Sequence, residues 1–272
     1  MGNVGPAAAA VVVYNVACGD SITCRNLAEM NRPGLQVLIY DNSTRDMGNE
    51  AQCREKGWTY LGGKGNDGIS KAYNGCIDHL KQQGKQGYLC LLDDDTQVSQ
   101  AYFDAMSSQT EKIVVPLIYS AGRLLSPCRL SKGHRSRLFT DEKQAMEYTG
   151  SDISAINSGM AVELSLFDGY RYDENIFLDG VDHTFLRDMA AKGHRPKVMN
   201  FSFTHEFSGD SKPPKAAALN RFRIYARDYR YILREDFPAY LALVGRRMLH
   251  LTVQYGSLDF FRAFLACRKG SK

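Results

Sequence analysis

The sequence predicts an α/β fold, with a mostly parallel central sheet flanked by helices and a C-terminal helical extension. Over the first half of the chain, apolar runs rich in β-forming residues alternate with polar turns and helical patterns, without a clear hairpin signal. Strands that alternate with helices form βαβ units, which build a parallel sheet. Beyond a Pro-Pro step at 213–214 the chain becomes helical and rich in Arg and Tyr. We therefore expect an α/β domain at residues 1–212 and a helical extension at 213–272.

The expected elements are short apolar strands and amphipathic helices. The spacing of apolar residues separates the two, because helices repeat every three to four residues. Asp20 or Ser21 is the expected N-cap of the first helix, and Arg32-Pro33-Gly34 stops it. We predict strands at residues 8–14, 35–40, 58–61, 88–92, 113–119 and 198–203, and helices at 22–31, 69–83 and 181–191.

Composition indicates a folded protein with a mild excess of positive charge. Hydrophobic residues make up 44% of the 272 residues and charged residues 24%, which excludes global disorder. The formal net charge of +4 and the pI near 8.6 fit a phosphate-bearing ligand or an anionic membrane surface. The same charge is too small to indicate binding to nucleic acid.

Cysteine usage and hydropathy bear on the compartment. The seven cysteines, an odd number without a C-x-x-C pair, are expected to be buried reduced thiols, which indicates a reducing compartment. The N-terminus lacks the basic region of a signal peptide, and no stretch approaches the ~20 apolar residues that span a bilayer. We therefore expect a cytoplasmic protein, either soluble or peripheral at the inner face of the cell membrane.

Three consecutive aspartates, Asp93-Asp94-Asp95, directly follow the apolar strand expected at 88–92. Adjacent carboxylates repel each other unless a positive charge lies between them. Mg²⁺ and Mn²⁺ take carboxylate oxygens together with phosphate oxygens, so a metal site is one reading. A solvated turn that caps a following helix is the other. Ligands gather at the carboxyl ends of parallel strands, which favours the metal site.

Two other polar clusters fall at similar places. Asp41-Asn42-Ser43 ends the second expected strand, where it forms either an ordinary Asx turn or a contact to the base or ribose of a nucleotide. Asn66 begins a loop that enters the helix expected at 69–83. The free N–H groups at a helix start favour phosphate, although plain helix capping explains the same residues.

Three further residues are candidates for chemistry near the end of the α/β domain. Asp179 and Asp182 precede or begin the helix expected at 181–191, where either is a general base or an N-cap. His205 follows the strand expected at 198–203, and a lone histidine is either structural or, near a metal, a ligand.

Taken in order, these pieces resemble the family 2 glycosyltransferases of the GT-A fold, over roughly residues 8–210. The pieces are Val12-Val13-Tyr14-Asn15, Asp41-Asn42-Ser43, Asn66-x-Gly68-x-x-x-Ala72-x-Asn74-Gly75, Leu91-Leu92-Asp93-Asp94-Asp95-Thr96, Ser158-Gly159 and Phe177-Leu178-Asp179-Gly180-Val181-Asp182. Within the family the chain is similar to bacterial rhamnosyltransferases, because its acidic pair is spread as Asp179-x-x-Asp182.

The resemblance implies a role for each matched position. Asp182 matches the catalytic base, and Asp95 is the expected metal ligand within a DxD motif formed with Asp93. His205 matches a late histidine near the metal or diphosphate. The remaining matches are nucleotide contacts at Tyr14, Asn15, Asp41, Asn66, Asp93 and Asp94, and contacts to the donor or acceptor sugar at Ser158, Gly159 and Asp179.

The activity that this resemblance implies is an inverting sugar transfer in surface polysaccharide synthesis. The expected donor is a dTDP- or UDP-linked sugar, with rhamnose or another hexose as the sugar, and the expected acceptor is a saccharide or a lipid-linked sugar. The expected cofactor is Mn²⁺ or Mg²⁺.

Two other functions compete with this interpretation. A sugar-phosphate nucleotidyltransferase needs a Gly-rich, basic loop after the first strand, but residues 15–20 read Asn-Val-Ala-Cys-Gly-Asp. A non-catalytic module that binds a nucleotide or carbohydrate is disfavoured by the intact Asp93, Asp95 and Asp182.

Beyond the expected domain, an apolar stripe at helical spacing favours packing against the domain or against a second copy of the chain. The alternative is an amphipathic element on an anionic membrane. The stripe is Phe237, Tyr240, Leu241, Val244, Met248 and Leu251. A basic loop at residues 129–137 is expected to be a solvated surface loop, and its alternative role is to fold over phosphates.

Overall fold

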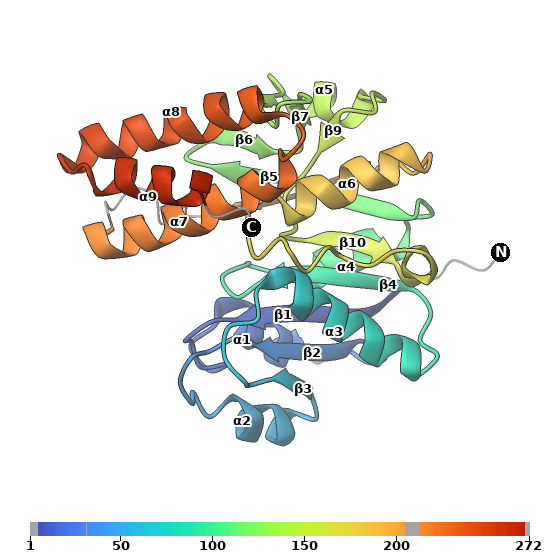
Figure 1. Cartoon of the computed structure of the whole chain (residues 1–272). Coiled ribbons are helices and arrows are strands. Elements are labelled where there is room, and N and C mark those ends of the chain that lie inside the picture. The colour runs from blue at the N-terminus through green and yellow to red at the C-terminus, as the bar shows by residue number, and fades with distance from the viewer. Residues whose placement is uncertain (1–4, 31, 205–212, 270–272) are drawn as a thin grey trace.

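In the computed structural model, the described residues are 5–30, 32–204 and 213–269. A central sheet lies between two layers of helices, and the last three helices form a group beside it (Figure 1). The predicted α/β class with a C-terminal helical extension is confirmed. The division of the chain at residue 212 stays a prediction.

The main sheet has the strand order β11-β5-β10-β4-β1-β2-β3, with β6 paired to β5. A small antiparallel sheet in the order β8-β7-β9 lies apart from it. The bounds are β1 Pro6–Val13, β2 Gln36–Asp41, β3 Thr59–Gly62, β4 Tyr88–Asp93, β5 Ile113–Ser120, β6 Arg123–Ser126, β7 Cys128–Leu130, β8 Ser136–Leu138, β9 Ile153–Ser154, β10 Met160–Glu163 and β11 Lys197–Thr204.

The helices cover both faces of the main sheet. Their bounds are α1 Ile22–Met30, α2 Asn49–Lys56, α3 Ile69–Gln82, α4 Gln100–Ser107, α5 Glu142–Glu147, the 3-10 helix η1 Leu164–Asp168, α6 Val181–Ala191, α7 Lys215–Ile232, α8 Phe237–Tyr255 and α9 Asp259–Lys269. The predicted strands and helices lie within two residues of these bounds. Ser21 is the N-cap of α1, because its Oγ accepts a hydrogen bond from the N–H of Cys24.

The direction of one central strand departs from the expected parallel arrangement. β1, β2, β3 and β4 are parallel neighbours, and β5 is parallel to β11. β10, however, runs antiparallel between β4 and β5. The chain reaches β10 after β6 and the small sheet, so no crossover helix carries it back to the starting edge. This long connection lies where the sequence pattern weakens.

The core consists of two apolar layers, one on each face of the main sheet. Ala8 and Ala10 of β1 face the layer formed with α3 and α6, whereas Ala9 and Val11 face the layer formed with α1, α2 and α4. Burial on both faces explains why the strands read as continuous apolar runs. All seven cysteines are free thiols, and six of them are buried.

The helices α7, α8 and α9 pack around an apolar cluster of their own that includes Phe222, Tyr240 and Phe260. Of the predicted apolar stripe, Tyr240, Val244 and Met248 are buried, but Leu241 is exposed. Among the described residues, we find no helix with the length and apolar character needed to cross a bilayer.

Candidate active site

The carboxyl ends of β2, β1 and β4 bring polar residues to one edge of the sheet. Val13 of β1 is the register partner of Asp41 on β2, and Val12 is the register partner of Asp93 on β4. Neighbouring strands lie about 4.8 Å apart, so Tyr14, which follows β1, ends between the two acidic positions.

The turn formed by the three aspartates is held in place by the start of α1. The hydroxyl of Thr23 donates to the backbone oxygen of Asp93 at 2.5 Å, and the hydroxyl of Ser21 donates to the backbone oxygen of Asp94 at 2.6 Å. The N–H of Thr23 also donates to the Asp94 oxygen. The start of α1 therefore holds the turn by the backbone oxygens of Asp93 and Asp94, and the carboxylates remain available for other partners.

The electrostatics of this turn show a surplus of negative charge. Burial and the neighbouring Asp95 raise the pKa of Asp93 to about 7, a hydrogen bond from Ser158 partly offsets the rise, and Asp94 and Asp182 add to it. Burial and Asp95 also raise the pKa of Asp94. The charge of Asp182 contributes to the pKa of Asp93, so the two carboxylates lie within electrostatic reach of each other.

A divalent hard cation fits this group of residues by its chemistry. Among the described residues, no group of three or more His, Cys, Asp or Glu side chains has the arrangement of a metal site. Mg²⁺ and Mn²⁺ nevertheless take one or two protein carboxylates and complete their shell with phosphate and water oxygens. Asp95 is exposed, and the raised pKa of Asp93 marks an excess of negative charge that a cation would remove. His205 lies outside the described residues.

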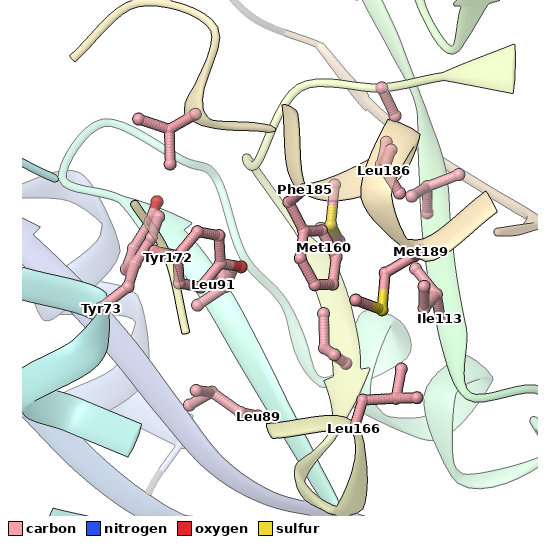
Figure 2. Close-up of a cluster of buried hydrophobic side chains, with 14 of the residues drawn as sticks. Tyr73, Leu89, Leu91, Ile113, Met160, Leu166, Tyr172, Phe185, Leu186 and Met189 are labelled. Atoms are coloured by element: carbon pink, nitrogen blue, oxygen red, sulfur yellow. The ribbon is translucent and has the colours of Figure 1, made fainter. Parts of the chain in front are cut away.

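The floor under the acidic group is an apolar cluster with two buried phenols. Figure 2 shows Tyr73 of α3 and Tyr172 beside Leu91 of β4, and their ring centroids are 5.3 Å apart. Burial raises the pKa of Tyr73 well above its usual value, and Asp93 and Asp182 contribute to the rise. The charges of Asp93 and Asp182 therefore both reach this apolar cluster.

Asp182 lies in the first turn of α6, two residues after Gly180, whose positive φ of 78° begins the helix. Its side chain is 16% exposed, and its Oδ1 accepts a hydrogen bond from the N–H of His183 at 2.7 Å. The imidazole of His183 is held by Ser154, with 2.7 Å between Nδ1 and Oγ. The carboxylate of Asp182 is thus positioned by its own helix start and remains partly open to solvent.

The segment before α6 is anchored to α3. Asn74 accepts a hydrogen bond from the N–H of Tyr172 and donates to the backbone oxygen of the same residue, each at 3.0 Å. The hydroxyl of Ser70 donates to the oxygen of Ile176, and the N–H of Ile69 donates to the oxygen of Phe177. These bonds fix the path of the chain toward Asp182.

The same segment is clamped from the other side by α7. Asp228 is fully buried, and its carboxylate accepts the backbone N–H groups of Phe177, Leu178 and Asp179. The carboxylate of Asp179 is in turn paired with both terminal nitrogens of Arg221. A contact between Asp179 and a sugar therefore requires this ion pair to open.

A cavity of about 720 Å³ lies beside the acidic group, between the sheet edge and the C-terminal helices. Tyr14 is 51% exposed and lines it, and α7 and α8 contribute Arg221 and Arg247. The three aspartates and Asp182 do not line the cavity, but Val12, the register partner of Asp93, does. The lining is Val12, Tyr14, Asn42, Asn66, Gly68, Ile69, Phe177, Leu178, Pro213, Ala217, Ala218, Asn220, Arg221, Ile224, Arg247, Leu251, Gln254 and Tyr255.

Two predicted nucleotide contacts are occupied by protein partners. Asp41 is buried, and its carboxylate accepts hydrogen bonds from the N–H of Ser43, the amide of Asn49 and the hydroxyl of Tyr60. Asn15 adopts a positive φ of 55°, and its Oδ1 accepts from Thr44. These two side chains shape the strand ends beneath Tyr14.

Three other predicted residues also shape the site. Ser158 is buried, and its hydroxyl bonds that of Thr96 at 2.9 Å. A side chain on Gly159 would lie 2.4 Å from the ring of Phe203, so only glycine fits there. Asn66 lines the cavity, and its Oδ1 accepts from the N–H of Gly68 in an Asx turn.

The basic loop at residues 129–137 is less solvated than predicted. Arg135 and Arg137 are exposed, but His134 is only 5% exposed and its ring contacts Tyr229 at a centroid distance of 5.7 Å. Burial, with His183 and Arg187 nearby, lowers the pKa of His134 to about 4. The loop is therefore tied to α7, while a role over phosphates stays a prediction.

Sequence reasoning missed the cavity residues that come from the C-terminal helices. Arg221 and Arg247 line the cavity because α7 and α8 fold back over the strand ends. Helical periodicity identifies the apolar side of a helix, but it does not show which other element the polar side meets. Asn42 was within a recognised polar cluster, and its position directly after β2 was the available signal.

Comparison with known proteins identifies the fold. No family model matches the sequence, and no curated protein matches it. The chain is similar to the crystal structure of S. aureus TarS 1–349 in complex with UDP-GlcNAc, with a TM-score of 0.51 and 14% identity, over 96% of this chain and 78% of that one. The chain has the GT-A fold.

A second structure is similar to a lesser degree. It is glucosyl-3-phosphoglycerate synthase from Mycobacterium tuberculosis in complex with Mn²⁺, UDP and phosphoglyceric acid, with a TM-score of 0.48 and 10% identity, over 89% of this chain and 79% of that one.

Proposed function

We propose that this protein is a glycosyltransferase that moves a sugar from a nucleotide-diphosphate donor to an acceptor hydroxyl. The observation that carries the proposal is the grouping of Asp93, Asp95 and Asp182 at the carboxyl edge of a GT-A sheet, beside the cavity lined by Tyr14. The exposed ring of Tyr14 offers a flat apolar surface on which a nucleotide base can stack.

The chemistry is a single displacement that inverts the anomeric carbon. The carboxylate of Asp182 accepts the proton of an acceptor hydroxyl while the oxygen attacks the anomeric carbon. The bond from that carbon to the diphosphate breaks, and a nucleoside diphosphate leaves. General-base assistance of this kind accelerates a reaction about 10²–10⁴-fold.

Asp95 and Asp93 are the residues that would hold Mn²⁺ or Mg²⁺. When bound, such an ion neutralises the charge that develops on the leaving diphosphate. The start of α3 lies at the cavity wall through Gly68 and Ile69, and the positive end of the helix dipole there favours the same negative charge. The proposed nucleotide contacts are Tyr14 and Asn66 from the cavity wall, with Asn15 and Asp41 shaping the strand ends.

We propose a dTDP- or UDP-linked donor, with rhamnose or another hexose as the sugar. The acceptor is a saccharide or a lipid-linked sugar of a surface polysaccharide. UDP-GlcNAc in the TarS structure is compatible with a donor of this class. The sugar side of the site is formed by Ser158, Gly159 and Asp179 in this proposal.

The first test is a calorimetric titration of UDP, dTDP, GDP and CDP, each with and without Mn²⁺. We expect one diphosphate to bind in a metal-dependent manner, which would also identify the base of the donor. Absence of binding for all four, with or without the metal, would contradict the proposal.

The assignment of the base is tested by Asp182→Asn. This change removes the proton acceptor but keeps the size of the side chain, so we expect the transfer rate to fall about 10²–10⁴-fold with nucleotide binding unchanged. Asp188→Asn, on the same helix, is the matched control and should keep the rate. A variant at 182 with near-normal turnover would remove the base assignment.

The competing functions give different results in the same assays. A nucleotidyltransferase would form a nucleotide-sugar from a nucleoside triphosphate and a sugar phosphate. A binding module would bind a nucleotide or sugar without either transfer or donor hydrolysis. The partly buried group of like charges around Asp93 favours an enzyme over the module, because burying like charges costs free energy.

We also propose that the C-terminal helices contact a membrane peripherally. Leu249 and Val253 of α8, and Leu258 and Phe261 next to or on α9, are exposed apolar side chains. Exposed apolar residues on an amphipathic helix favour the membrane interface. Flotation with anionic vesicles tests this, and a homodimer through the same residues, detected by light scattering, is the alternative outcome.

A further inference from the structure

A second cavity, which we call the arginine groove, lies between α7 and α9 and has a volume of about 700 Å³. It is lined by Arg223, Arg227, Arg230 and Arg234, with Asn175 and Asn220 beside them. Among the described residues, no Asp or Glu lines the groove, so all of its charged side chains are positive. Figure 1 shows α7 and α9 running beside each other.

The sequence places Arg223, Arg227 and Arg230 on one side of α7, and Arg234 follows two residues after the end of the helix. The spacings of four and three residues keep the three helical arginines on a single face, because an α-helix repeats every 3.6 residues, and Arg234 continues the row in the turn that follows. Arg221, which pairs with Asp179, lies outside this spacing. The face is therefore a continuous strip of guanidinium groups rather than a random scatter.

Most of this positive charge is not neutralised by the protein. Within the described part of the chain, Arg227 contacts the carboxylate of Asp228 at 3.2 Å, whereas Arg223, Arg230 and Arg234 have no carboxylate within 4.0 Å. Asp228 already accepts three backbone N–H groups. Like charges gathered in a concave groove create a positive potential that attracts anions.

The guanidinium groups are also held in position. Arg227 stacks over Phe177 at 4.9 Å, Arg230 over Phe237 at 5.5 Å, and Arg234 over Tyr231 at 4.6 Å. Stacking orders each planar group before any ligand arrives. Arg227 donates from Nε and one terminal nitrogen to Asp228, and Arg234 donates from one terminal nitrogen to the backbone oxygen of Tyr231, so part of each guanidinium is already bonded. The Nε of Arg230 is buried and has no hydrogen-bond partner among the described atoms, although buried donors are normally paired.

The arginine groove adjoins the cavity of the proposed active site. Asn220 and Ile224 of α7 line both of them. A ligand held in the groove can therefore extend along α7 toward the site.

We propose that the arginine groove binds a phosphate-bearing part of the acceptor, either a phosphodiester or a diphosphate. Arg donates paired hydrogen bonds that match phosphate geometry, and several arginines suit a compact group with more than one negative charge. That the bound phosphate belongs to the acceptor rests on the proposed function, but phosphate binding in the groove does not. The phosphate comes either from a soluble chain or from a lipid headgroup.

Calorimetry with inorganic tripolyphosphate in EDTA tests the groove directly. The groove variant is Arg223→Gln with Arg234→Gln, and the matched control is Arg54→Gln with Arg246→Gln, which removes the same charge from exposed arginines elsewhere. We expect the groove variant to bind tripolyphosphate about tenfold or more weakly than wild type, because charge-assisted hydrogen bonds are lost. The control should change Kd less than twofold. Equal losses in both variants, or no binding by the wild type, would overturn the proposal.

Vesicles separate the two sources of phosphate. A lipid headgroup is the source if the wild type floats with phosphatidylglycerol vesicles but not with phosphatidylcholine vesicles, and if the groove variant no longer floats. Flotation unaffected by the groove variant, together with its weakened tripolyphosphate binding, assigns the phosphate to a soluble chain. All proteins are also titrated with nucleoside diphosphate and Mn²⁺. If the nucleoside diphosphate does not bind but tripolyphosphate binds as expected, the proposed function is contradicted and the phosphate site in the groove is not.

Discussion

At the scale of single residues, Asp228 shows how a buried carboxylate can organise a distant catalytic group. It is fully buried, and it accepts the N–H groups of three consecutive residues that lead toward Asp182. A charged acceptor holds these N–H groups more strongly than a neutral one would. The position of the proposed base is therefore set partly by a residue of the C-terminal helices.

Asp228→Ala should destabilise the protein strongly. The change leaves three backbone donors without their acceptor and Arg227 without its partner, and we expect the free energy of unfolding to fall by about 3 kcal/mol. Urea denaturation measures this. Asp20→Ala, in an exposed turn, is the control and should stay within about 0.5 kcal/mol of wild type. A similarly small change at 228 would mean that the clamp contributes little.

His134 gives the stability a specific dependence on pH. Its pKa is lowered from 6.5 to about 4 by burial and by His183 and Arg187 of α6, and Tyr229 of α7 covers its ring. The unfolded chain therefore takes up a proton below pH 6.5 that the folded chain refuses until about pH 4. Stability rises with pH across this window and is lost as the pH falls.

The expected size of this effect at pH 4 is about 3 kcal/mol of the free energy of unfolding. In His134→Asn, which tolerates the positive φ of this position, the loss between pH 7 and pH 4 should be smaller by that amount. Denaturation curves at the two pH values check this. An unchanged pH dependence would show that another group is responsible.

The polar residues of the site were predictable to different degrees. Asp93 and Asp41 were found because each directly follows an apolar strand, and parallel strands end at one edge. The sequence did not show that the carboxylate of Asp41 accepts hydrogen bonds from Asn49 and Tyr60, because these partners belong to elements that meet Asp41 only in the folded chain.

At the scale of elements, apolar spacing predicted several of the helices that bury an apolar stripe, although it missed α4, which buries Tyr102, Phe103 and Met106. α3 and α6 have such stripes and were located within two residues. α2 was missed because it is almost wholly polar and buries only Asn49 and Cys53. The antiparallel β10 was missed for a different reason, since an apolar run does not record the direction in which the chain crosses the sheet.

The start of α8 depends on a single capping residue. The carboxylate of Asp236 accepts the N–H of Ala239, and Pro238 is accommodated in the first turn. Asp236→Ala should lower the free energy of unfolding by about 1 kcal/mol, as other N-cap losses do. Thermal denaturation measures the change, and Asp236→Ser, which retains a capping oxygen, should recover most of it.

At the scale of the whole molecule, the C-terminal helices are part of the candidate site rather than an appendage. They provide Arg221 and Arg247 to the cavity and Asp228 to the segment before α6. The apolar stripe predicted that these helices pack against the α/β domain or a second copy of the chain, but it did not predict that they line the candidate site. Contacts between segments far apart in the chain leave no periodic signal.

A chain that ends at residue 212 should therefore fail to bind the nucleoside diphosphate that the full chain binds. We expect it to expose apolar surface as well, because α7 no longer covers Phe177 and Leu178. Calorimetry and the fluorescence of an apolar dye measure the two effects. Nucleotide binding equal to that of the full chain would show that residues 1–212 form the site alone.

The hydrogen bonds from the backbone at 177–179 to Asp228 also make it possible to measure how often α7 separates from this segment. The amide protons of these residues can exchange with deuterium only when α7 lifts from the sheet edge, because the carboxylate that shields them belongs to that helix. Their exchange rates would thus report how often α7 separates from the segment that precedes α6.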